Sequence, residues 1–112
     1  MATKKAVTKK KSAPARKALR YVIIRAKEAG CFFGVLDSRP SETSAVITQA
    51  RRLWYWSGAA SLSQMAMEGV SNPSACKFPP VVDRQEIIGV IEVLDCTERA
   101  IASIQGVAPW RA

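Results

Sequence analysis

The chain of 112 residues is long enough for one small domain, and its 48% hydrophobic residues suffice for a core without forming a run that could span a membrane. The net charge of +8 is carried entirely by residues 1–20, which hold eight basic side chains and no acidic one. The absence of histidine excludes His-based triads and acid–base chemistry and weakens the case for most zinc sites.

Residues 1–20 are predicted to form a disordered basic tail, because they offer little apolar surface to offset the entropy of folding. No apolar block follows this basic start, so no signal peptide is expected. The tail can contact the phosphates of a nucleic acid or an acidic partner, or it can be a solvated arm that aids solubility. The candidate nucleic-acid-binding residues are Lys4, Lys5, Lys9, Lys10, Lys11, Arg16, Lys17 and Arg20.

The first half of the remaining chain is predicted to be β-structure. β-Branched residues predict a strand over 21–26, a turn that ends at Gly30, and a returning strand over 31–37 with a bulge at Gly34. The longest predicted strand covers 44–56. Its alternation places the consecutive Arg51 and Arg52 on opposite faces, which puts one of them near a groove or an interface.

A helix is predicted over 58–69, because alanine, leucine, glutamine and methionine favour helices. Ser61 and Gln64 have the spacing of a capping box, and Ser57 is an earlier possible cap. Gly69 stands where a helix often ends in glycine.

The last third of the chain begins with a proline-rich excursion over 70–85 that is expected to contain a short extended piece at Pro79 and Pro80. A strand is predicted over 86–96, apolar on both faces, and a second short helix over 97–106, capped by Thr97. The sum is one α+β domain over residues 21–112, with a small, mostly antiparallel sheet of four to five strands and two short helices.

Three scattered cysteines, Cys31, Cys76 and Cys96, lack a CxxC pair and predict reduced structural thiols rather than a metal site. Cys96 precedes a predicted helix, where the pKa of a thiol can be lowered, but no base or second thiol accompanies it. No carboxylates form a recognisable catalytic pair. The sequence therefore predicts no enzyme, no metal and no cofactor.

The stretch "RRLWYWSGAASLSQ", residues 51–64, looks most like a binding site. A strand that ends in aromatic residues leads through a Ser-Gly step into a helix, whose first N–H groups can bind an anion, and an aromatic ring can stack on a base. The candidate ligand-binding residues are Arg51, Arg52, Trp54, Trp56, Ser57, Gly58 and Ser61. The alternative is structural, because aromatic residues on strands commonly fill a core or a subunit interface, which would indicate self-association.

Four separated motifs, "RRLWYWSGAASLSQMAMEG", "NPSACKFP", "EVLDCTERA" and "SIQGVAPW", resemble a family of small proteins of tailed bacteriophages that is a domain of unknown function. The resemblance covers roughly residues 21–111 and excludes the basic tail. It implies a phage gene expressed in the cytoplasm of a bacterial host, and it implies no catalytic residue.

Two functions follow as expectations. The first is a non-enzymatic phage accessory protein, a homo-oligomeric module that binds a nucleotide-like or phosphate-bearing ligand near residues 54–61. The alternative is a structural or virion-associated protein whose basic tail contacts nucleic acid. The expected location is the host cytoplasm or the virion, and no contact with a membrane is expected.

Overall fold

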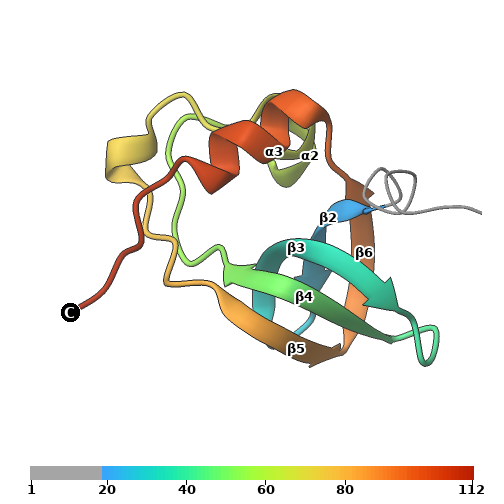
Figure 1. Ribbon diagram of the computed structural model, residues 1–112. Coiled ribbons are helices and arrows are strands. Elements are labelled where there is room, and N and C mark those ends of the chain that lie inside the picture. The colour runs from blue at the N-terminus through green and yellow to red at the C-terminus, as the bar shows by residue number, and fades with distance from the viewer. Residues whose placement is uncertain (1–18) are drawn as a thin grey trace, which may run out of the picture.

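A computed structural model describes residues 19–112 as one antiparallel sheet with two α-helices and a short 3-10 helix beside it (Figure 1). The predicted α+β class is confirmed. The predictions for residues 1–18 lie outside the described part of the chain. The elements in chain order are β2 (Tyr21–Ala26), β3 (Gly30–Ser38), β4 (Ser44–Arg52), α2 (Leu62–Glu68), the 3-10 helix η1 (Pro73–Ala75), β5 (Val82–Ile88), β6 (Val90–Asp95) and α3 (Glu98–Gln105).

The predicted hairpin of β2 and β3 forms the centre of the sheet. Its antiparallel register places Ile23 opposite Phe33 and Ile24 opposite Phe32. Successive side chains of a strand point to opposite faces, and here both faces are buried. Ile23 and Phe33 face the helices, whereas Ile24 and Phe32 enter a second cluster on the other face of the sheet.

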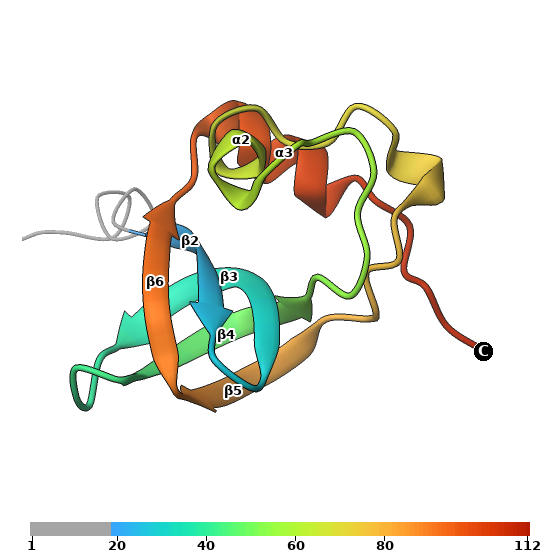
Figure 2. The ribbon, with the colours of Figure 1, turned by 180° about the vertical axis from the view of Figure 1, so that it is seen from behind.

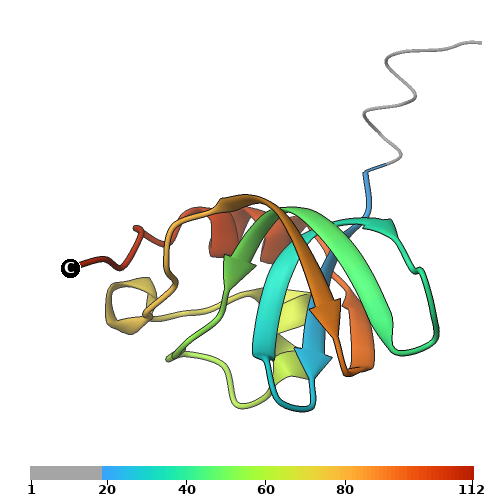
Figure 3. The same cartoon turned by 90° about the horizontal axis from the view of Figure 1, so that it is seen from below.

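The sheet has the strand order β5-β4-β3-β2-β6, so β5 and β6 lie at opposite edges although only Gly89 separates them in the chain. The sheet must therefore curl until its two edges meet at this residue (Figure 3). Backbone hydrogen bonds fix the corner, because the N–H groups of Gly89 and Val90 both donate to Thr43 and the Gly89 carbonyl accepts from Lys27. The curled sheet encloses the second cluster, which includes Ile47 and Ile87.

The prediction of a single strand over 86–96 is wrong, because the chain turns at Gly89 to leave one edge of the sheet and join the other. The apolar residues on both faces of this stretch thus belong to two different strands, one at each edge of the sheet. The strand at the first edge also begins earlier than predicted, at Val82, inside the stretch that was expected to be a proline-rich excursion.

The predicted strand over 44–56 ends at Arg52, because its partner strand ends there. Phe32 lies opposite Arg52, and β3 begins only two residues before Phe32, so the chain beyond Leu53 has little of β3 left to pair with. Leu53 donates a last hydrogen bond to Cys31 and is buried among the residues that face the helices. The following residues cross from the sheet to the helices.

Helices α2 and α3 cover the face of the sheet that carries Ile23 and Phe33 (Figure 2). The predicted caps are confirmed, since the Ser61 side chain accepts from the Gln64 N–H and the Thr97 side chain accepts from the Ala100 N–H. Helix α2 begins at Leu62, four residues after the predicted start, because Ser61 is its cap. Neither α-helix of the described chain has the length and hydrophobicity needed to span a membrane.

Candidate functional site

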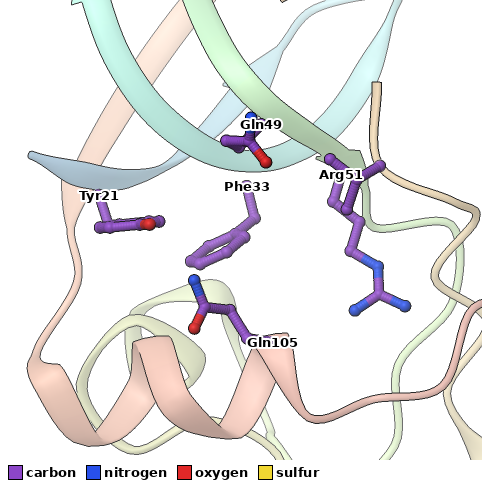
Figure 4. A pocket seen from close by; sticks show the side chains of 6 residues that line it. Tyr21, Phe33, Gln49, Arg51 and Gln105 are labelled. Carbon is purple, nitrogen blue, oxygen red and sulfur yellow. The ribbon is translucent and has the colours of Figure 1, made fainter. Parts of the chain in front are cut away.

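A pocket of about 170 Å³ lies between the sheet and the end of α3 (Figure 4). Its lining comes from every layer of the fold: Tyr21 of β2, Phe33 of β3, Gln49 and Arg51 of β4, Val81 before β5, and Gln105 at the end of α3. The Tyr21 and Phe33 rings stack with their centroids 5.6 Å apart and an angle of 25° between their planes. They form an aromatic wall of the pocket.

A β-bulge positions Gln49 on this pocket. The register between β3 and β4 shifts between Phe33 and Val35, so that Gly34 faces more than one residue of β4. A Cβ atom at Gly34 would lie 2.8 Å from the Thr48 carbonyl oxygen, which explains why the position is glycine. The bulge predicted at Gly34 is confirmed, and it holds Gln49 at a φ of 52°, in the left-handed region that non-glycine residues rarely adopt.

Arg51 stands at one end of the pocket with its guanidinium group almost completely buried, since the residue is 4% exposed. The group donates to four backbone carbonyls, at 2.9 Å to Ile104, 2.6 Å to Val107, 3.2 Å to Phe78 and 3.1 Å to Pro79. The Ile104 carbonyl lies in the last turn of α3, at the negative end of the helix dipole, and the Val107 carbonyl follows the end of the helix.

Burial lowers the pKa of Arg51 from its ordinary value, but guanidinium groups remain charged near neutral pH. No carboxylate within residues 19–112 forms a salt bridge with it. Arg51 therefore joins β4 to α3, and within residues 19–112 its positive charge is offset by carbonyl dipoles and by the Phe78 ring, whose centre lies 5.5 Å away, rather than by a carboxylate. This charge favours ligands that present acceptor atoms or negative charge to the pocket.

Two amide side chains on this pocket have no hydrogen-bond partner of their own in the described part of the chain. Gln49 and Gln105 are both exposed, and neither side-chain amide takes part in a hydrogen bond among residues 19–112. Each amide can donate and accept. The pocket thus combines an aromatic wall, two available amides and a fixed positive charge.

Of the seven predicted ligand-binding residues, only Arg51 lines this pocket. Arg52 points to the opposite face, as its alternation predicted, where it donates to the Ala29 carbonyl at 2.8 Å and lies 4.6 Å from the centre of the Phe32 ring. Trp54 is 63% exposed. Trp56 is half-buried against the residues that face the helices.

The remaining three predicted residues make contacts within the chain itself. The Ser57 hydroxyl accepts from the Asn72 amide, and the Gly58 carbonyl accepts from the Ser71 N–H. A Cβ atom at Gly58 would lie 2.5 Å from the backbone nitrogens of Ser71 and Asn72, so glycine is needed for the close approach of two chain segments. Ser61 is occupied as the cap of α2.

The pocket residues that sequence reasoning missed are Tyr21, Phe33, Gln49, Val81 and Gln105. They are separated by up to 84 positions in the sequence, and only Gln105 belongs to one of the quoted motifs, "SIQGVAPW". The one usable signal was Gly34, because a bulge in β3 or β4 redirects a neighbouring side chain.

The cysteines are all free thiols. Burial and the adjacent Asp95 carboxylate raise the pKa of Cys96 to about 12, the opposite of the lowering that a helix start can produce. Burial also raises the pKa of Cys31. Both groups are therefore protonated at neutral pH and are poor nucleophiles. Among residues 19–112, no cluster of three or more His, Cys, Asp or Glu side chains is arranged to hold a metal ion.

One family model, described as a domain of unknown function (DUF6948), matches residues 19–104. No curated protein and no solved structure matches the chain.

Proposed function

The chain belongs to the DUF6948 family of domains of unknown function, and we propose from the geometry of its pocket that it is a non-enzymatic module that binds a nucleotide-like ligand by its base. The observation that carries this proposal is the meeting of an aromatic wall with two glutamine amides, which have no hydrogen-bond partner among residues 19–112, beside the buried Arg51. The ligand site thus lies between the sheet and α3 and not at the start of α2.

The size of the pocket limits what can enter it. A volume of about 170 Å³ is smaller than the roughly 300–1,000 Å³ of pockets that hold a whole drug-sized ligand. One planar ring system fits this size better than a complete nucleotide does. The sugar and phosphate of a nucleotide would then remain outside the pocket.

The chemistry of the pocket matches the edge of a base. Proteins recognise unpaired bases by stacking them on aromatic rings and by hydrogen bonds to their edges. Here Tyr21 and Phe33 supply apolar aromatic surface, and the amides of Gln49 and Gln105 can both donate and accept. The charge of Arg51 favours a base that turns carbonyl oxygens toward it.

A thermal-shift panel followed by calorimetry tests this proposal. Bases, nucleosides and nucleotides should raise the melting temperature, whereas ribose 5-phosphate and inorganic phosphate should not. A ligand present at ten times its dissociation constant stabilises the fold by about 1.4 kcal/mol, which corresponds to roughly 6–11 °C for a domain of this size. Stabilisation by phosphate alone, or by none of these compounds, would refute the proposal.

Two pocket variants and one control locate the binding. Gln105→Ala and Tyr21→Leu should weaken the best ligand, because each removes one of the proposed contacts. Gln85→Ala is the matched control, since Gln85 lies on β5 and does not line the pocket. Equal loss of affinity in all three variants would place the ligand elsewhere.

A second function is supported by the charge distribution. All of the net positive charge lies in residues 1–20, and the rest of the chain is formally neutral. We therefore propose that this segment contacts nucleic acid. Arg20, the one described member of the set, also forms a salt bridge with Asp95 at 2.7 Å, although both side chains are largely exposed. Replacement of the five lysines at positions 4, 5, 9, 10 and 11 by glutamine should strongly weaken DNA or RNA binding and reduce its salt dependence, because five of the eight basic side chains are lost.

We propose a bacterial cell infected by a phage as the setting of either function. The motifs that resemble a family from tailed bacteriophages support a protein that acts in the cytoplasm of an infected bacterium or within the virion. Detection of the protein by mass spectrometry in purified virions, compared with infected-cell lysates, distinguishes these two locations.

A further inference from the structure

We propose that two copies of this chain associate through β5, by antiparallel pairing of the same strand in each copy. This surface is separate from the ligand pocket and from the exposed Trp54. The proposal rests on three observations: β5 has a free edge, the exposed side chains on one of its faces are self-complementary, and the other edge of the sheet lies against its own chain.

The free edge is the first observation. Strand β5 pairs with β4 on one side, and no strand among residues 19–112 pairs with its other side. A strand edge presents unpaired N–H and C=O groups and is a template for another strand. Edge strands that remain single are usually protected by charged side chains, proline or a bulge. Strand β5 has no proline and no bulge within Val82–Ile88, its register with β4 is regular, and the two charged side chains on its outer face, Arg84 and Glu86, have opposite signs.

The side chains of β5 are the second observation. Val82, Arg84, Glu86 and Ile88 share one face of the strand and are all exposed, Ile88 to 73% and Val82 to 50%. If two copies pair antiparallel about a twofold axis at Gln85, Arg84 lies opposite Glu86 of the second copy. Val82 then lies opposite Ile88. Every exposed position on this face therefore meets a chemically suitable partner, as an isologous contact requires.

The neighbouring registers are disfavoured by the same residues. A shift of the twofold axis to Arg84 would place two arginines opposite each other, and a shift to Glu86 would place two glutamates opposite each other. Like charges directly opposite each other destabilise a strand pair. The sequence of β5 thus specifies one register as well as one partner.

The other edge of the sheet, β6, is the third observation. The loop between β3 and β4 lies against it, because Thr43 accepts hydrogen bonds from Gly89 and Val90. Arg39 and Glu42 of this loop line a groove together with Val90–Val93. An incoming strand would meet this loop at β6 but would find β5 open, so the contact of β5 with a second β5 is favoured over a contact of β5 with β6.

Charge reversal of the full chain tests the pairing. Sedimentation or light scattering should give twice the monomer mass of 12.2 kDa for the natural sequence. Arg84→Glu and Glu86→Arg should each weaken the dimer by at least about tenfold, because each places two like-charge pairs across the axis. Neither substitution breaks a salt bridge within the described chain, so both variants should fold.

Mixing the two charge-reversed variants tests directly whether opposite charges across the axis hold the dimer together. One copy then carries two glutamates and the other two arginines, so every charged pair is again opposite in sign. We expect a heterodimer as stable as the natural dimer, although each variant alone is monomeric.

Arg99→Glu, on α3, is the control for charge and should leave the dimer intact. Ile88→Lys removes the apolar contact and should also give monomers. A natural chain that stays monomeric at high concentration, an assembly whose mass none of these changes affects, or a mixture that fails to pair would each overturn the proposal.

Discussion

We predict that Gln49 strengthens ligand binding but lowers the free energy of unfolding of the protein. It adopts a φ of 52° in the bulge of β4, and its side-chain amide has no hydrogen-bond partner among residues 19–112. Strained backbone of this kind is concentrated at functional sites. We therefore expect Gln49→Gly to produce a more stable protein that has lost affinity for its ligand.

The magnitude follows from two opposing effects. A left-handed conformation costs a residue with a Cβ atom about 1–2 kcal/mol, and glycine avoids this cost. A glycine also makes the unfolded chain more flexible, and this lowers the stability of the fold by about 0.4–1 kcal/mol. The net gain is about 0.5–1 kcal/mol, or roughly 2–8 °C in melting temperature for a domain of this size.

Gln49→Ala is the matched variant, because it removes the same amide but keeps the Cβ atom and the strain. Urea unfolding followed by tryptophan fluorescence should find Gln49→Ala within about 0.5 kcal/mol of the natural protein and Gln49→Gly above both. Calorimetry should find that both variants bind the best base-containing ligand equally weakly. A glycine variant less stable than the alanine variant would refute the strain, and unchanged affinity in both would refute the role of the amide.

Three further predictions concern stability. Arg51→Lys should destabilise the fold by about 3 kcal/mol in urea unfolding, because a lysine cannot reach the four carbonyls that Arg51 binds. Gly58→Ala should lower the melting temperature markedly, since its Cβ atom would lie 2.5 Å from two backbone nitrogens, whereas Ala60→Ser on the same segment should not. The raised pKa of Cys96, about 12, means that the fold favours the protonated thiol, so stability should fall as the pH rises from the ordinary thiol value of about 9 toward 12. Cys96→Ser should show a smaller fall over that range in pH-dependent unfolding.

The local elements of this protein are determined by short-range patterns in its sequence. The hairpin of β2 and β3 follows from β-branched residues on either side of a turn at Gly30, and both helices begin at caps, Ser61 and Thr97, whose side chains bind the N–H three residues later. These features depend only on neighbouring residues, so a single sequence reveals them. The separation of the basic residues 1–20 from a neutral domain is likewise visible in the sequence alone.

The ends of the strands depended on residues far away in the chain. The strand that begins at Ser44 stops at Arg52 because β3 offers no further partner, and the stretch 86–96 is divided at Gly89 because the sheet curls and its edges meet there. Alternation of apolar residues predicts that a segment can be a strand but not which strand will lie beside it.

The tertiary structure alone decided where the candidate site lies. Arg51 and Arg52 are adjacent and chemically identical, yet Arg51 is buried against four carbonyls, two of them at the C-terminal end of α3, and Arg52 lies on the opposite face over Phe32. The pocket gathers Tyr21, Gln49 and Gln105 from three elements because the helices pack on one face of the sheet. Such a meeting of distant residues is produced by packing, which no local pattern in the sequence encodes.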